Sequence, residues 1–216
     1  IGLPAGLQSA VFAISNIVIQ SAINSLGKVV MAASSAAYNI EVFAYDVMNS
    51  YNQACTTFVG QNYGAGQIRR CRKTLYLCLI EDAVSLGATV ALVLLTGHFL
   101  LSIFNNDPQV IALGYDRLKI VFFAYIFSLL YEVMSGYLRG FGISLVPAAL
   151  TALGVCGIRI AWIHFVFPQH PTLQTIMTSY PVSLSATALM IFIALLCYRP
   201  ARKHAAMERE PAPTAK

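Results

Sequence analysis

This sequence contains few charged side chains. Only 11% of its 216 residues are Asp, Glu, Lys or Arg, whereas 57% are apolar. A soluble domain is usually about 25% charged and about 45–50% apolar. Residues 1–27 and 160–198 contain no charged side chain at all. Because about 20 apolar residues cross a bilayer as a helix, the composition predicts an all-α, polytopic membrane protein.

Several other patterns are missing. The five cysteines are odd in number and most lie in apolar runs, which argues against a disulfide framework. Cys71 and Cys78 have no nearby His or third Cys, so we expect no metal site. The net charge of +5 comes from short basic clusters between apolar stretches, which does not indicate a nucleic-acid partner. Sequence motifs of hydrolases, zinc proteases and dinucleotide-binding enzymes are absent, so we expect neither enzymatic activity nor an organic cofactor.

The beginning of the sequence also lacks features. It has no initiator Met, and its first apolar run starts at Ile1 without the basic segment of a signal peptide. We therefore expect a fragment that begins immediately before a helix.

Apolar runs separated by turn-forming residues predict a bundle of six transmembrane helices. The expected spans are residues 4–26, 31–59, 74–99, 110–138, 146–167 and 173–198. The breaks between them contain Gly, Asn, Pro or Gln, as in residues 60–66 and 168–171. We expect residues 1–198 to form one transmembrane lobe and residues 199–216 to form a disordered cytoplasmic tail.

Basic residues predict the orientation. Ten Lys and Arg residues fall on the side of the second-to-third loop, the fourth-to-fifth loop and the C-terminus, against three on the other side (Lys28, Arg117 and Lys119). By the positive-inside rule, the richer side is cytoplasmic. An even number of spans then places both termini of this segment in the cytoplasm, and a tandem copy would have the same orientation.

The second span carries an unusual number of polar residues. At 100° per residue they occupy one arc of roughly 160°. They are Tyr38, Asn39, Glu41, Tyr45, Asp46, Asn49, Asn52, Gln53, Thr56 and Thr57. Such an arc should not face lipid. It faces either a water-filled cavity or a polar seam between helices, and the two carboxylates favour the cavity.

Other ionisable residues fall within the spans. Arg159 lies about 20 Å from the cytoplasmic end of its span, a depth similar to that of Glu41 and Asp46. An unpaired Arg at that depth is costly. We therefore predict that Arg159 pairs with Glu41 first and Asp46 second, with Glu132 on the neighbouring span as a third option.

The carboxylates at positions 81 and 82 have a simpler interpretation. They lie closer to the cytoplasmic end of the third span, where Arg72 and Lys73 follow one another in the sequence. We expect Glu81 and Asp82 to lie near the membrane interface and to be compensated there.

Two glycine-containing motifs complete the pattern. Residues 59–66 read VGQNYGAG and are followed by two arginines, and residues 138–142 read LRGFG. We interpret both as tight cytoplasmic turns, with candidate residues Gly60, Gln61, Asn62, Gly64, Arg139 and Gly140. Together with Gly-Leu-Pro before the first span, they resemble the C-terminal half of the multidrug and toxic compound extrusion (MATE) family over the whole chain up to the tail.

The resemblance implies one half of a transporter with about twelve helices in two lobes. Such proteins expel cationic or amphipathic compounds in exchange for Na⁺ or H⁺. One branch of the family has a Glu and an Asp where this sequence has Phe12 and Ser128, so those cation-site roles do not carry over. The coupling-ion site is then expected to lie partly or wholly in an N-terminal lobe.

The leading hypothesis is secondary active multidrug efflux across the plasma membrane, with the bilayer, the N-terminal lobe and drug-like molecules as partners. The candidate transport residues are Asn39, Glu41, Tyr45, Asp46, Asn49, Gln53, Glu132 and Arg159. One alternative is a flippase for lipid precursors, which would need basic residues facing a lateral opening. The other is a membrane scaffold without transport activity, in which Glu41 and Asp46 pack dry with no accessible cavity.

Overall fold

A computed structural model of the chain describes residues 2–200, except for the side chains of residues 2–5 and 7–9. The predicted tail therefore lies almost entirely outside the described residues. Every element between residues 2 and 200 is helical. They are α1 (Gly2–Ser25), α2 (Lys28–Gly64), α3 (Ile68–Phe104), α4 (Pro108–Gly140), α5 (Leu145–Thr151), the π-helix η1 (Ala152–Gly157), α6 (Ile158–Phe165) and α7 (Leu173–Tyr198).

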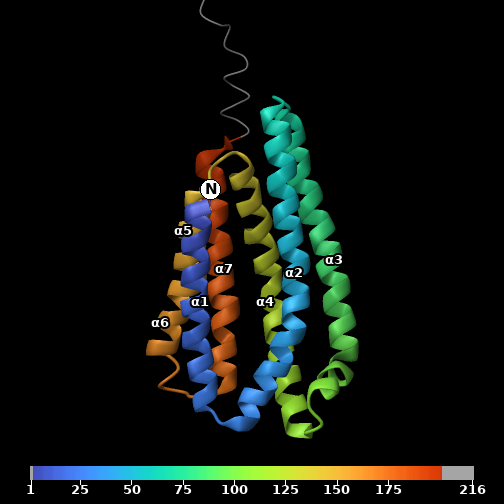
Figure 1. Ribbon diagram of the computed structural model, residues 1–216, viewed down its shortest axis with the longest axis vertical. Coiled ribbons are helices and arrows are strands. Elements are labelled where there is room, and N and C mark those ends of the chain that lie inside the picture. The colour runs from blue at the N-terminus through green and yellow to red at the C-terminus, as the bar shows by residue number, and fades with distance from the viewer. Residues whose placement is uncertain (1, 201–216) are drawn as a thin grey trace, which may run out of the picture.

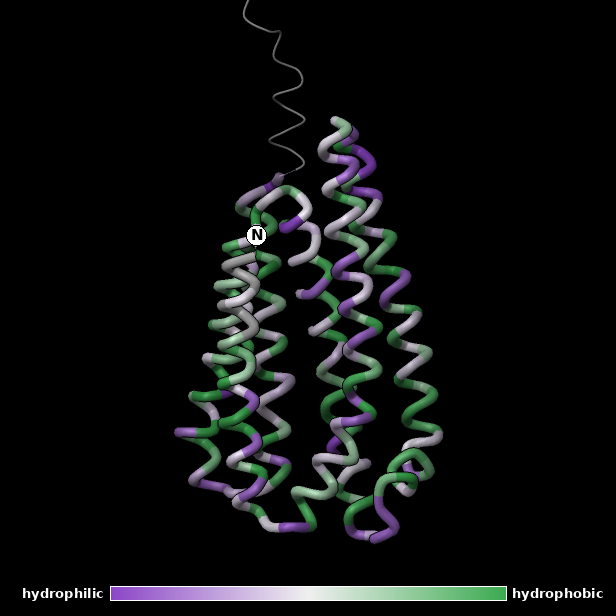
Figure 2. Tube along the Cα trace, viewed as in Figure 1, coloured by the Kyte–Doolittle hydropathy of each residue, from purple (hydrophilic) through white to green (hydrophobic). Residues whose placement is uncertain are grey.

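The helices α5, η1 and α6 follow one another without a break, so the described chain forms six rods. This confirms the all-α fold class. Four of the rods are long and apolar enough to cross a membrane: α3, α4, residues 145–165 and α7. The polar residues that recur along α2 keep it outside that group, as Figure 2 shows. The apolar part of α1, Ala10–Ser25, is shorter.

Local sequence explains where several helices begin. Asp107 accepts a hydrogen bond from the Gln109 backbone N–H at 2.8 Å, and Pro108 occupies the first turn, where a missing N–H costs nothing. Thr172 caps α7 by accepting from the Thr175 backbone N–H at 3.1 Å. These two N-caps set where α4 and α7 begin, directly after polar segments of the sequence.

The rods form two groups, with α1, α5–α6 and α7 on one side and α2, α3 and α4 on the other (Figure 1). Helix α4 joins the groups, because it packs extensively against both α2 and α7. Fully buried apolar side chains such as Met48, Phe122, Ile176 and Ile191 form the core along this junction. The two groups thus share one core around α4.

Helices α2 and α3 are longer than the predicted spans 31–59 and 74–99, since each has 37 residues. A helix of that length extends about 55 Å, well beyond the roughly 30 Å of a hydrocarbon core. Their connected ends project past the other helices (Figure 1). Only residues 65–67 form the turn between them, and Gly66 adopts a φ of 70° there.

Candidate functional site

A cavity of about 560 Å³ lies between the two groups of helices, within the size range of drug-binding pockets. Residues of α1, α2, α4, η1, α6 and α7 line it. We call it the central cavity. Its polar and charged lining residues outside the tyrosines are Asn16, Glu41, Asn49, Asn52, Ser128, Glu132, Arg139 and Arg159. Part of the polar arc of α2 therefore borders this cavity.

One wall of the central cavity carries the Glu132 carboxylate of α4. Asn52 Nδ2 of α2 donates a hydrogen bond to Glu132 Oε2, and the Tyr45 hydroxyl donates to Oε1 at 3.5 Å. These two hydrogen-bond partners are uncharged, and Arg139 at the end of α4 lines the same cavity. Glu132 is thus held in place while only 6% exposed.

Close packing of α2 on α4 fixes this wall. Thr56 Oγ1 donates to the Gly136 carbonyl at 3.1 Å. A Cβ atom at Gly136 would lie 2.5 Å from the Asn52 backbone oxygen and 2.6 Å from its side-chain oxygen. Only glycine allows α2 to approach closely enough for Asn52 to reach Glu132.

The opposite wall carries Arg159 on α6. Its Nε donates to Ser183 Oγ of α7 at 3.0 Å, and its guanidinium carbon lies 4.0 Å from the centre of the Tyr180 ring. The π-helical segment η1 ends just before this residue. A π-turn contains more residues than an α-turn, so it rotates the side chains that follow relative to a regular helix.

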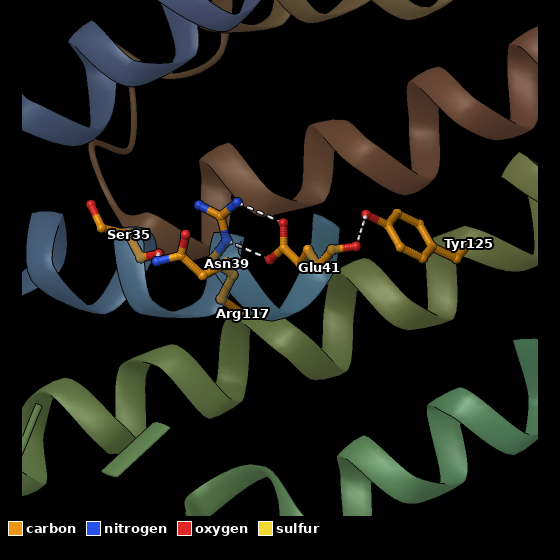
Figure 3. Close-up of polar contacts among 5 residues, drawn as sticks. All are labelled: Ser35, Asn39, Glu41, Arg117 and Tyr125. Carbon is orange, nitrogen blue, oxygen red and sulfur yellow. Dashed lines mark hydrogen bonds and ion pairs between the residues drawn. The ribbon is translucent and has the colours of Figure 1, made fainter. Parts of the chain in front are cut away.

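The predicted pairing of Arg159 with Glu41 is wrong. Glu41 instead forms a bidentate ion pair with Arg117 of α4, with Nε–Oε1 at 2.7 Å and Nη2–Oε2 at 2.8 Å (Figure 3). Both side chains are 3% exposed. The Tyr125 hydroxyl also donates to the Glu41 carbonyl at 3.5 Å. No Asp or Glu of the described chain forms an ion pair with Arg159, so the options Asp46 and Glu132 are wrong as well.

The position of Arg117 explains this difference. The sequence places Arg117 with the basic residues of the outer side, but it lies nine residues after Pro108 within α4 and is buried. Helix packing, rather than depth alone, selected its partner, because α2 and α4 are in close contact at Glu41. Arg159 is satisfied differently, by a hydroxyl and an aromatic face.

The candidate transport residues separate into two sets. Glu41, Tyr45, Asn49, Glu132 and Arg159 all line the central cavity. Asn39, Asp46 and Gln53 are exposed and outside its lining.

The sequence-based list missed several lining residues. Tyr125 and Tyr180 contribute aromatic surface, and Asn16 contributes an amide from α1. An apolar helix that carries a few aromatic residues gives no periodic signal that distinguishes a cavity wall from a lipid-facing surface.

The two glycine motifs do not both form turns. Gly60, Gln61, Asn62 and Gly64 belong to the last turns of α2, since the helix continues to Gly64. That part of the prediction is wrong because glycines inside a packed helix need not end it.

The ends of the two motif-bearing helices nevertheless meet. Arg139 and Gly140 end α4, and a Cβ atom at Gly140 would lie 2.6 Å from the Val59 side chain. A Cβ atom at Gly60 would lie 3.6 Å from the Gly140 carbonyl oxygen. The motifs therefore lock α2 to α4 at the end opposite to the Glu41–Arg117 pair.

The expectation for Asp82 also fails. Glu81 is exposed, but Asp82 is fully buried. Neither carboxylate oxygen of Asp82 has a hydrogen-bond partner among the described residues. Adjacent helix positions point about 100° apart, so one residue faces outward and the next faces the core.

These features define the class: an α-helical membrane protein whose apolar helices border a charged and aromatic cavity. The MatE family model matches residues 4–163, and the chain therefore belongs to the MatE family. Members of this family are transporters and not enzymes.

Curated relatives agree with this assignment. Multidrug resistance protein PmpM of Pseudomonas aeruginosa is 29% identical over 234 residues, which cover 100% of this chain and 46% of that protein. Multidrug and toxin extrusion protein 1 of Mus musculus is 31% identical, covering 62% of this chain and 24% of that protein. The chain thus spans at most about half the length of these relatives.

Solved structures share the fold. A crystal structure of MATE in the bent conformation matches with a TM-score of 0.84 and 16% identity, covering 95% of this chain and 46% of that chain. An outward-facing multidrug resistance MATE family transporter matches with a TM-score of 0.80 and 16% identity, covering 97% and 46%.

Proposed function

We propose that the protein containing this chain is a secondary active transporter that expels cationic or amphipathic drugs in exchange for Na⁺ or H⁺. The observation that carries the proposal is the central cavity, in which carboxylate, guanidinium and aromatic groups border one drug-sized space within an apolar bundle. Charged side chains inside a membrane bundle are expensive and typically mark a transport path.

Residues 1–198 would supply one transmembrane lobe, and an N-terminal lobe would supply the facing wall. In two-lobe carriers the substrate site lies between the repeats. We place the transporter in the plasma membrane with both termini of this segment in the cytoplasm, since basic residues cluster at that side. The tail from residue 199 would lie there too.

Within this lobe, Glu132 is the best candidate for reversible binding of the coupling ion. Glu41 is neutralised by Arg117, and Asp46 is exposed outside the cavity lining. Phe12 and Ser128, which occupy the positions of a family cation site, both line the central cavity. Glu132 lies one helical turn from Ser128 on the same face of α4, so a carboxylate is present close to that position.

The scaffold alternative is less well supported. It expected Glu41 to pack against another helix with no accessible cavity. Glu41 does contact α4 through Arg117, but it also borders the central cavity.

The test uses the intact transporter expressed in cells that lack their own multidrug pumps. Dye accumulation is measured under imposed Na⁺ and H⁺ gradients for the wild type, Glu132→Gln and the matched control Asp46→Asn. We expect the wild type and Asp46→Asn to lower accumulation and Glu132→Gln to lose gradient-driven efflux. Unchanged accumulation of every dye by the wild type under both gradients would refute the proposed function.

A further inference from the structure

We propose that Arg159 forms a recognition site for an anionic oxygen group on the transported molecule, namely the carboxylate of an aromatic, zwitterionic substrate. The inference rests on the proposed efflux function and specifies one substrate contact within it. It assigns a role to a buried cation that neither the coupling ion nor the packing of this lobe requires.

The first argument is unused hydrogen-bonding capacity. A guanidinium has five N–H donors, and within the described chain only Nε of Arg159 donates, to Ser183. The side chain is 7% exposed and lines the central cavity. The outer edge of the guanidinium, with its two terminal nitrogens, is therefore the part that remains for a ligand.

The second argument is preorganisation. Ser183 holds Nε, and the Tyr180 ring lies beneath the guanidinium carbon at 4.0 Å. Trp162 Nε1, one turn further along α6, donates to the Thr175 carbonyl of α7 at 2.9 Å and fixes the two helices together. A guanidinium fixed on one edge and one face offers its other edge to a planar carboxylate, which it binds in a bidentate manner.

The third argument concerns charge around the cavity. Glu41 and Arg117 neutralise one another and contribute no net charge. Glu132, held by Asn52 and Tyr45 on the α4 wall, supplies a carboxylate. Arg139 at the end of α4 also lines the cavity, so the space presents a cation from α6 and, from α4, a carboxylate and a second guanidinium. This arrangement complements a molecule carrying both signs.

Aromatic side chains complete the complementarity. Phe12, Tyr125 and Tyr131 line the same space, which at about 560 Å³ has room for a fused-ring compound. Stacking and cation–π contacts from such rings favour a flat, positively charged body. Arg159 would then bind the carboxylate of the substrate while its cationic ring system lies between the aromatic side chains.

The experiment compares two dyes that differ at one group. Rhodamine 110 carries a free carboxylic acid, and rhodamine 123 is its methyl ester; ethidium serves as a cation without a carboxyl group. Gradient-driven efflux of each is measured for the intact wild-type transporter in proteoliposomes, together with Arg159→Gln, Arg159→Lys and the control Asp46→Asn. The readout is KM and maximal rate for each dye.

We expect the wild type to have a lower KM for the acid than for the ester. Arg159→Gln should raise the KM for the acid about tenfold, the loss of one charge-assisted contact, with the ester and ethidium unchanged. Arg159→Lys should fall between, because Lys keeps the charge without the bidentate geometry. Equal wild-type KM values for acid and ester would overturn the proposal without reference to any variant.

Other outcomes are also decisive. An equal loss for all three dyes in Arg159→Gln would mean that Arg159 serves folding or pairs with a carboxylate of the other lobe. Competition by phosphatidylglycerol vesicles, abolished by Arg159→Gln and without acid–ester discrimination, would assign the site to a lipid phosphate instead. Absence of wild-type efflux of every dye would refute the proposed function itself, which is distinct from a failure of the Arg159 site.

Discussion

The Glu41–Arg117 pair allows a quantitative prediction. Both side chains are 3% exposed, and two N–O contacts of 2.7 and 2.8 Å join α2 to α4. Replacing Arg117 by Leu leaves the Glu41 carboxylate buried without a counter-charge. Breaking a buried pair on one side costs about 3–5 kcal/mol, and a charge at bilayer depth costs at least ~2.5–3.5 kcal/mol on insertion scales.

The double replacement Glu41→Leu/Arg117→Leu should cost far less than either single change. No charge is then left uncompensated, and apolar replacements of a buried pair are often neutral. Since 1 kcal/mol corresponds to roughly 2–4 °C for 150–250 residues and to about half of that for a protein twice as long, each single variant should lower the apparent Tm of the intact protein by about 3–10 °C. The double variant should recover more than half of that loss.

The assay is the apparent Tm of the detergent-solubilised intact protein, followed by size-exclusion fluorescence. Lys119→Ala provides the control, because its ion pair with Asp116 at 2.6 Å is exposed and should contribute nothing measurable. If the double variant is as unstable as the worse single variant, the electrostatic reasoning is wrong and the two side chains matter through their packing.

Three further predictions follow from the geometry. Gly136→Ala should destabilise the protein by about 1–3 kcal/mol through overpacking, whereas Gly87→Ala, whose added Cβ meets nothing within 4 Å, should not lower the apparent Tm. Maleimide should label Cys197, the exposed cysteine of this chain, under native conditions, and the four buried cysteines only after denaturation. If native labelling of this lobe is as strong in Cys197→Ser as in the wild type, the described burial of the other four cysteines is contradicted. Asp82→Leu should stabilise the protein by roughly 1–3 kcal/mol and so raise its apparent Tm, because it removes a buried carboxylate whose oxygens lack partners in the described chain; a lower apparent Tm would show that Asp82 binds a group essential for stability.

The sequence by itself determined the class of fold. Long uncharged stretches can satisfy their backbone in a bilayer only as helices, so composition predicted the six rods with boundaries close to those of α1, α4 and α7. The same reasoning identified α2 as the polar helix, because ten polar residues on one arc cannot face lipid. Helix ends were less predictable where glycines, as at Gly60 and Gly64, continue a helix that local propensity would end.

Only the tertiary structure decided which charges meet. Depth along a helix is a one-dimensional coordinate. It places Arg159 at the same level as Glu41, but it contains no information on which way each side chain points or which helices are neighbours. Because α2 packs against α4, Glu41 forms its ion pair with Arg117. Arg159 follows the π-helical segment η1, and Tyr180 and Ser183 of α7 hold its side chain. Ion pairs inside a bundle depend on helix order and phase, which arise from packing the whole core and not from any single segment.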